Sequence, residues 1–159
     1  MHIRAAHERD APALSALAFE AKAHWGYSVA QLATWREDLV ITPRALASHP
    51  CHVAELGSEI AGFCLLEPAA PHWHVEHLWV RPSCMGRGVG RALLAHAAGE
   101  AARAGAIALA IDADPNAQGF YLRCGAVRVG WLAAPIDGQP DRERPQLLLA
   151  VSGRACAAP

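Results

Sequence analysis

A run of alternating glycines is the segment of this chain whose residue types and spacing point most directly to chemistry. Residues 85–94 read Met-Gly-Arg-Gly-Val-Gly-Arg-Ala-Leu-Leu and follow an apolar stretch. A strand, a glycine-rich turn and a helix can form an anion site, because glycine allows close backbone approach and the first helical N–H groups lack intrahelical partners. Those donors, the helix dipole and the side chains of Arg87 and Arg91 favour a phosphate or pyrophosphate.

The glycine spacing argues against two common phosphate loops. A P-loop needs Lys and then Ser or Thr after its last glycine, whereas Gly90 is followed by Arg91 and Ala92. A Rossmann turn needs Gly-x-Gly-x-x-Gly, and Arg91 stands at the place of its third glycine. A tight turn that binds nothing is the simple alternative.

The loop resembles the pyrophosphate loop of the GNAT N-acetyltransferases, which reads Gln/Arg-x-x-Gly-x-Gly/Ala. Gly88 and Gly90 fall on its two small positions, and Met85 stands where Gln or Arg is usual. The resemblance implies that backbone N–H groups bind the pyrophosphate of acetyl-CoA, the expected co-substrate. The residues implied in cofactor binding are Gly86, Arg87, Gly88, Val89, Gly90 and Arg91.

A second segment, residues 112–126, resembles the later GNAT motif Asn-x-x-Ala-x-x-Phe-Tyr-x-x-x-Gly-Phe. The matching residues are Asn116, Phe120, Tyr121 and Gly125. Asp114 as a cap and Pro115 at the first helical position predict a short helix here. The resemblance implies that Asn116 contacts the cofactor arm and that Tyr121 is the acid that protonates the leaving thiolate. Packing in the core is the alternative role for Tyr121.

The general base is expected on the fourth strand. A protonated amine, with an ordinary pKa near ~10.4, must lose a proton before it attacks a thioester. Glu76 is the preferred base, because a period of two places it on the strand face of Leu78 and Val80. A surface glutamate is the alternative, with His74 and His77 as other bases. The resemblance implies that this strand splays from the fifth and frees backbone groups of Leu78 and Val80 to bind the cofactor.

Residues 21–27 read Ala-Lys-Ala-His-Trp-Gly-Tyr and resemble a turn found between the first two helices of some bacterial GNAT proteins. In that fold the turn lies over the acceptor cleft. The resemblance makes His24, Trp25 and Tyr27 candidate substrate contacts. Aromatic side chains that hold the two helices together are an equal alternative.

Metal and thiol chemistry are disfavoured. His72, His74 and Glu76 would share a strand face, but strand spacing alone is weak support for a zinc site, and we expect no metal. Cys84 and Cys124 show no sign of an activating base that would make either an acyl-carrying nucleophile.

Length and charge narrow the class of protein. The 159 residues suit a single domain, residues 1–159, and the net charge of −1 gives no electrostatic case for nucleic acid or an anionic membrane. We see no membrane-spanning run and no signal-peptide apolar region. Five scattered cysteines without a Cys-x-x-Cys pair favour a reduced, cytoplasmic protein. A homodimer stays open.

The hydrophobic pattern predicts a mixed α/β fold, with a central sheet of about seven strands and helices on both faces. This is also the element order of the GNAT fold. The expected strands are 2–6, 51–56, 60–66, 73–80, 106–111, 127–132 and 147–151. The expected helices are 11–25 with Asp10 as its cap, 29–39, 88–104 and one from Pro115. We also expect a short or irregular stretch at 43–50 and a polar loop at 137–145.

Together these patterns predict an N-acetyltransferase that moves an acetyl group from acetyl-CoA to a primary amine by direct attack in a ternary complex. The amine could belong to a small molecule or a peptide, and the sequence does not distinguish them. The alternative from another class is a non-catalytic acyl-CoA sensor with the same loop. A metal hydrolase is a distant third.

Overall fold

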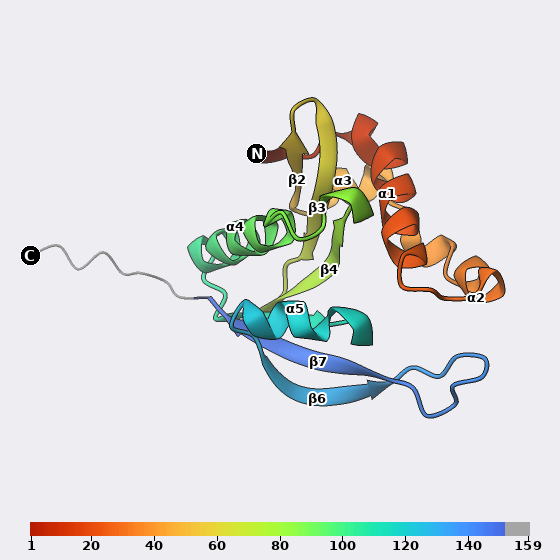
Figure 1. Ribbon diagram of the computed structural model, residues 1–159. Helices are drawn as coiled ribbons and strands as arrows, with labels where there is room; N and C mark the ends of the chain where they lie inside the picture. Colours follow the sequence, from red (N-terminus) through yellow and green to blue (C-terminus); the bar gives the residue numbers. More distant parts are fainter. Residues whose placement is uncertain (152–159) are drawn as a thin grey trace, which may run out of the picture.

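Within residues 1–151, which the computed structural model describes, seven strands form one sheet in the order β1-β2-β3-β4-β5-β7-β6 (Figure 1). The strands are β1 His2–Ala5, β2 Cys51–Leu56, β3 Glu59–Glu67, β4 His72–Val80, β5 Ala108–Asp112, β6 Val127–Ala133 and β7 Glu143–Ala150. The helices are α1 Ala11–Ala23, α2 Val29–Thr34, α3 Pro43–Ser48, α4 Val89–Arg103 and α5 Gln118–Arg123. Single 3-10 turns are η1 Glu8–Asp10, η2 Glu37–Leu39, η3 Pro82–Cys84 and η4 Pro115–Ala117.

Helices cover both faces of the sheet, as the pattern predicted. Leu93 and Leu94 of α4 and Tyr121 of α5 belong to the core on one face. Leu14 and Leu17 of α1 belong to the core on the other face. Burying a leucine side chain contributes roughly 1.5–3 kcal/mol, so these contacts fix the helices against the sheet. The mixed α/β fold class is confirmed.

The pairing of β4 with β5 is the feature that shapes the site. The two strands are parallel and pair only from His72 to His74, opposite Ala108 to Ala110. Beyond His74 the edge of β4 that faces β5 has no strand partner, while its other edge stays paired with β3 as far as Val80. The two strands therefore diverge and open a gap in the sheet, as expected.

Three sequence expectations need correction. The helix expected at 29–39 ends at Thr34, because Trp35 leaves the helical conformation, and η2 follows. Asp10 does not cap α1 through its side chain; its carboxylate accepts hydrogen bonds from the His7 amide and from Arg4 instead.

The last strand begins earlier than the expected start near residue 147, and the polar loop is shorter. Residues 143–145 of β7 have β6 as their strand partner and lie past the end of β5, where the Pro145 carbonyl accepts the N–H of Ala113. Pro145 can lie there because a residue on a single-sided stretch of strand need not donate to a second neighbour. The proline concealed the start of this strand.

Candidate active site

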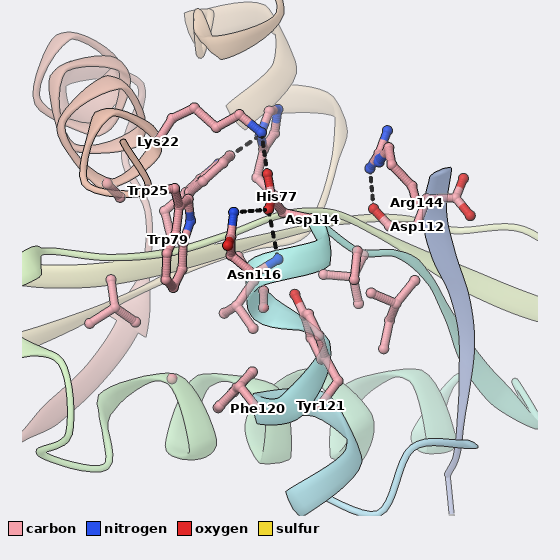
Figure 2. A pocket seen from close by; sticks show the side chains of 18 of the residues that line it. Lys22, Trp25, His77, Trp79, Asp112, Asp114, Asn116, Phe120, Tyr121 and Arg144 are labelled. Carbon is pink, nitrogen blue, oxygen red and sulfur yellow. Dashed lines mark hydrogen bonds and ion pairs between the residues drawn. The ribbon is translucent and has the colours of Figure 1, made fainter. Parts of the chain in front are cut away.

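The divergence of β4 and β5 opens into a cavity of about 1100 Å³. Its walls come from the second half of β4, the glycine loop (residues 85–91), the start of α4, the turn after β5, and α5 (Figure 2). The end of α1 and the loop before β7 contribute at one side. Both motifs singled out in the sequence therefore meet in one cavity.

The glycines of this loop are required for two different reasons, backbone conformation and packing. Gly86 and Gly88 have φ angles of 75° and 82°, the left-handed region that favours glycine, and Gly88 is the N-cap of α4. Gly90 is small for packing: a Cβ there would lie 3.2 Å from Phe120 and 3.4 Å from Val80. The helix therefore begins tightly against α5 and β4.

Most of the expected cofactor residues line the cavity. Those on its wall are Leu78, Val80, Gly86, Gly88, Val89, Gly90, Arg91 and Asn116. Arg87 is exposed and does not line the wall, although it is part of the same loop. Of the two loop arginines, Arg91 alone is placed to meet a ligand in the cavity.

The backbone of β4 presents free groups at the gap. Arg81 donates its N–H to the Ala61 carbonyl on β3, at 2.8 Å. In an antiparallel pair, alternate residues direct their N–H and C=O groups to the same edge. The backbone groups of Trp79 therefore face β3, as those of Arg81 do. The backbone groups of Leu78 and Val80 face the opposite edge of β4, which is no longer paired with β5.

Glu76 is exposed and lines the cavity, but it lies at an irregularity of the strand. Opposite β3 the register shifts so that Leu65 pairs with His77 and Leu66 with Val75, which leaves Glu76 as the extra residue of a β-bulge. The strict period of two is interrupted here. The argument that placed Glu76 on the face of Leu78 therefore fails, and its place on the cavity wall is what supports a role.

The two alternative bases differ in their surroundings. His74 is exposed and lines the cavity. His77 also lines it, but its Nδ1 accepts a hydrogen bond from the Trp79 indole at 3.1 Å, and burial lowers the pKa of His77 to about 4. Such an imidazole is a weak base at neutral pH, so His77 is poorly suited to deprotonate an amine.

Tyr121 lies on α5 with its ring edge-on to Phe120, at 4.9 Å between centroids. It is buried and lines the cavity, into which Figure 2 shows it extending from α5. Among residues 1–151 its hydroxyl has no hydrogen-bond partner. Burial raises the pKa of Tyr121 well above its usual value, so the phenol stays protonated at neutral pH.

A buried ionic cluster closes one side of the cavity. Asp114 accepts a hydrogen bond from Lys22 at 2.5 Å and from the Tyr27 hydroxyl at 2.9 Å. The Asn116 side chain donates to the same carboxylate at 3.0 Å, and the Arg142 guanidinium lies 3.7 Å from it. Figure 2 shows Lys22 and Asn116 converging on Asp114 from opposite elements.

The charges in this cluster are uneven, since two cations share one carboxylate. Burial alone would raise the pKa of Asp114, but the charge and hydrogen bond of Lys22, with further hydrogen bonds from Asn116 and Tyr27, hold it below its usual value. Burial lowers the pKa of Lys22, and the attraction of Asp114 only partly offsets this. The Lys22 ammonium also lies 4.2 Å from the centre of the Trp35 ring.

Only one of the three residues expected to contact the acceptor lies on the cavity wall. Trp25 lines the cavity, whereas His24 is exposed and, like Tyr27, is not on the wall. Tyr27 lies behind the wall, where it holds Asp114. Lys22, at the end of α1 in the same segment, was not expected to have a role, but it forms an ion pair with Asp114.

Other residues of the cavity wall escaped the sequence analysis. They include Trp35, Trp79, Arg142 and Arg144. Arg142 belongs to a segment that was expected to be an irregular polar loop, and no spacing signals its distance to Asp114. Trp79 could have been found, because it lies between Leu78 and Val80, the two strand residues that were expected to bind the cofactor. His72, His74 and Glu76 do not gather as a metal-binding group in the described structure.

This fold and cavity define a class of enzyme. Residues 14–126 match the acetyltransferase (GNAT) family, so the chain belongs to this family and is an acetyltransferase. The fold, the enzyme class and the resemblance to the GNAT family are confirmed. A comparison with curated proteins finds no match. None of the described helices is long and apolar enough to cross a membrane.

Solved structures have the same fold. A GCN5-related N-acetyltransferase from Rhodopseudomonas palustris is 24% identical, with a TM-score of 0.78 over 94% of each chain. The ribosomal-protein-S18-alanine N-acetyltransferase from Escherichia coli is 17% identical, with a TM-score of 0.72 over 99% of this chain and 98% of its own. YncA from Salmonella typhimurium, with its cofactor acetyl-CoA, is 20% identical, with a TM-score of 0.70 over 100% of this chain and 97% of its own.

Proposed function

We propose that the protein transfers the acetyl group of acetyl-CoA to a primary amine by direct attack in a ternary complex. The observation that carries this proposal is the meeting of three features in one cavity: the open edge of β4, the glycine loop at the start of α4, and Tyr121. The family match and the acetyl-CoA ligand of the Salmonella structure support the choice of donor.

The cofactor would enter along the gap between β4 and β5. Its pyrophosphate would lie against the backbone N–H groups of the glycine loop, with Arg91 beside it and Arg87 outside the contact. The pantetheine would bind the free backbone groups of Leu78 and Val80, much as an added strand binds an open sheet edge. Asn116 donates to Asp114, which leaves its amide oxygen to accept from the cofactor arm.

The transfer step needs an electrophile, a base and an acid. The neutral amine attacks the thioester carbonyl, and a backbone N–H on the open edge of β4 stabilises the negative charge on the carbonyl oxygen. The carbon–sulfur bond then breaks, and Tyr121 gives its proton to the leaving thiolate. We propose that Glu76 accepts the proton of the amine, directly or through water, because Glu76 lines the cavity whereas His77 is a weak base.

The acceptor would approach from the side of the ionic cluster. Trp25 and Trp35 offer aromatic surface there, and the Lys22–Asp114 pair shapes the wall behind them. Small-molecule and peptide amines both fit this description. A cytoplasmic location is part of the proposal, since the cysteines of the described residues are free and most are buried.

Amine-dependent release of coenzyme A tests the proposal against the sensor alternative. The full chain is incubated with acetyl-CoA and a panel of an alkyl amine, amino acids, an aminoglycoside and a peptide with a free N-terminus. Free thiol and acetylated product are measured, and acetyl-CoA binding is followed by calorimetry. Binding with amine-dependent release supports transfer. Binding without release for any amine favours the sensor, and no binding contradicts both.

A further inference from the structure

Away from the cavity, two imidazoles and a carboxylate converge between the sheet and α4. His52 lies on β2, while His96 and Glu100 lie one turn apart on α4 and so face the same way. Their candidate ligand atoms all lie within 4.8 Å of one another, and no other trio in residues 1–151 does so. None of the three lines the cavity.

The side chains of this group lie close together, but one of their buried polar atoms lacks a hydrogen-bond partner among the described residues. His52 Nδ1 lies 3.3 Å from Glu100 Oε2, yet this buried oxygen has no hydrogen-bond partner in the described part of the chain. The rings of His52 and His96 lie 4.3 Å apart, tilted by 55°. A buried carboxylate oxygen without a donor is costly, by about 1–3 kcal/mol or more for a charged group, and therefore needs a reason.

We propose that His52, His96 and Glu100 form a binding site for a divalent transition-metal cation, with Zn²⁺ the best match. Two imidazole nitrogens and one carboxylate oxygen form a known zinc ligand set, and water takes the fourth position. Tetrahedral bonds of ~2.0–2.1 Å place ligand atoms ~3.3 Å apart, which is the separation of His52 and Glu100. The third ligand closes by on the order of 1 Å through side-chain rotation.

The metal would act on the fold rather than on the acetyl group. It would join β2 to the C-terminal half of α4, and α4 begins at the glycine loop. His96 lies seven residues beyond Val89, roughly 10 Å along the helix axis, so the cation stays outside the cavity. The Glu100 oxygen that lacks a hydrogen-bond partner within residues 1–151 would coordinate the cation. Thermal stability would then rise with metal concentration by mass action.

The test is titration of the metal-free full chain with ZnCl₂ by calorimetry, and with Co²⁺ by optical absorption. We expect one Zn²⁺ per chain and tetrahedral Co²⁺ absorption without a thiolate band. His96→Gln and Glu100→Gln should each weaken binding at least ~10-fold and abolish the Zn²⁺-dependent rise in Tm. His2→Gln removes an exposed histidine of β1 and should bind as the wild type does.

A second measurement needs no variant. In the wild type, Zn²⁺ should shift the imidazole NMR signals of His52 and His96 and leave that of His2 unchanged. The absence of saturable binding, equal affinity in all variants, or a thiolate charge-transfer band would each overturn the proposal.

Discussion

Lys22 and Asp114 are ninety-two positions apart in the chain, yet the Lys22 Nζ lies 2.5 Å from Asp114 Oδ2 with both side chains largely buried. The pair joins the end of α1 to the turn after β5. Asp114 also accepts the backbone N–H of Asn116, and it thereby fixes the start of the segment that leads into α5 and Tyr121. One ion pair thus links the acceptor side of the cavity to the proposed acid.

The uneven charge of this cluster predicts an order of stability loss. Asp114→Asn leaves Lys22 and Arg142 as two buried cations without an anion, and should cost about 3–5 kcal/mol of unfolding free energy. Lys22→Met leaves Asp114 with Tyr27, Asn116 and Arg142, and should cost about 1.5–3 kcal/mol. Urea unfolding at pH 7 measures both, and a larger loss in Lys22→Met would contradict the assigned charges.

Local signals predicted the elements and most of the cavity wall. The cap at Asp114 was expected and forms, with its carboxylate 2.9 Å from the Asn116 amide. The partner of Asp114 could not be predicted, because Lys22 lies in another element and no pattern encodes a contact over that separation. The bulge at Glu76 was missed for a related reason: a register shift is set by pairing with β3, not by the alternation of the strand itself.

The two arginines of the loop provide a matched test of cofactor binding. Arg91 lines the cavity and Arg87 does not, although both are exposed and carry the same charge. Arg91→Ala should weaken acetyl-CoA binding roughly 10-fold, the scale of one charge-assisted hydrogen bond, and Arg87→Ala should change it by less than about twofold. Calorimetry measures both. Equal losses would show that only the general charge of the loop matters.

Gly90 is a poor probe of the same loop. A side chain there meets Phe120 at 3.2 Å before it meets any ligand, so Gly90→Val should lower stability as well as affinity. Thermal unfolding without cofactor checks this. An unchanged Tm together with lost binding would show that Phe120 can move aside and that the glycine serves the ligand alone.

The partly buried His77 predicts a loss of stability in mild acid. Its pKa is about 4 in the folded protein and ~6.5 in the unfolded chain, so the unfolded state binds more protons between these values. The contribution is complete above pH ~6.5 and is lost as the pH falls toward 4, by about 2 kcal/mol between pH 7 and pH 5. His77→Gln, which keeps an acceptor for Trp79, should reduce the pH dependence by that amount in urea unfolding.

Glu76 provides a test of the base. If it accepts the amine proton, Glu76→Gln should bind acetyl-CoA normally and lose turnover by roughly 10²-fold or more near pH 7. Part of the activity should return at alkaline pH, because more of the amine is then neutral. His74→Gln is the matched control from the same strand and cavity wall. Wild-type turnover in Glu76→Gln, with a loss in His74→Gln, would transfer the role to His74.

Tyr121 provides the sharpest test of the chemical step. Its hydroxyl has no partner in residues 1–151, and burial raises its pKa, so the phenol is protonated and its hydroxyl is free at the cavity wall. Tyr121→Phe removes one oxygen, keeps the ring against Phe120, and should leave stability nearly unchanged. Turnover should fall by roughly 10²-fold or more, while acetyl-CoA affinity changes much less, because the interaction strengthens only as thiolate charge develops.

The control for Tyr121 is the chain's other tyrosine. Tyr27→Phe removes the same group from a residue that lies behind the wall and bonds to Asp114, so it should lower stability more than turnover. Steady-state kinetics with any accepted amine, beside direct binding of acetyl-CoA, compare the two variants. Turnover of Tyr121→Phe within about threefold of wild type would mean that the ring only packs or that chemistry is not rate-limiting. Single-turnover kinetics distinguish those outcomes, since only a packing role leaves the chemical step itself unchanged.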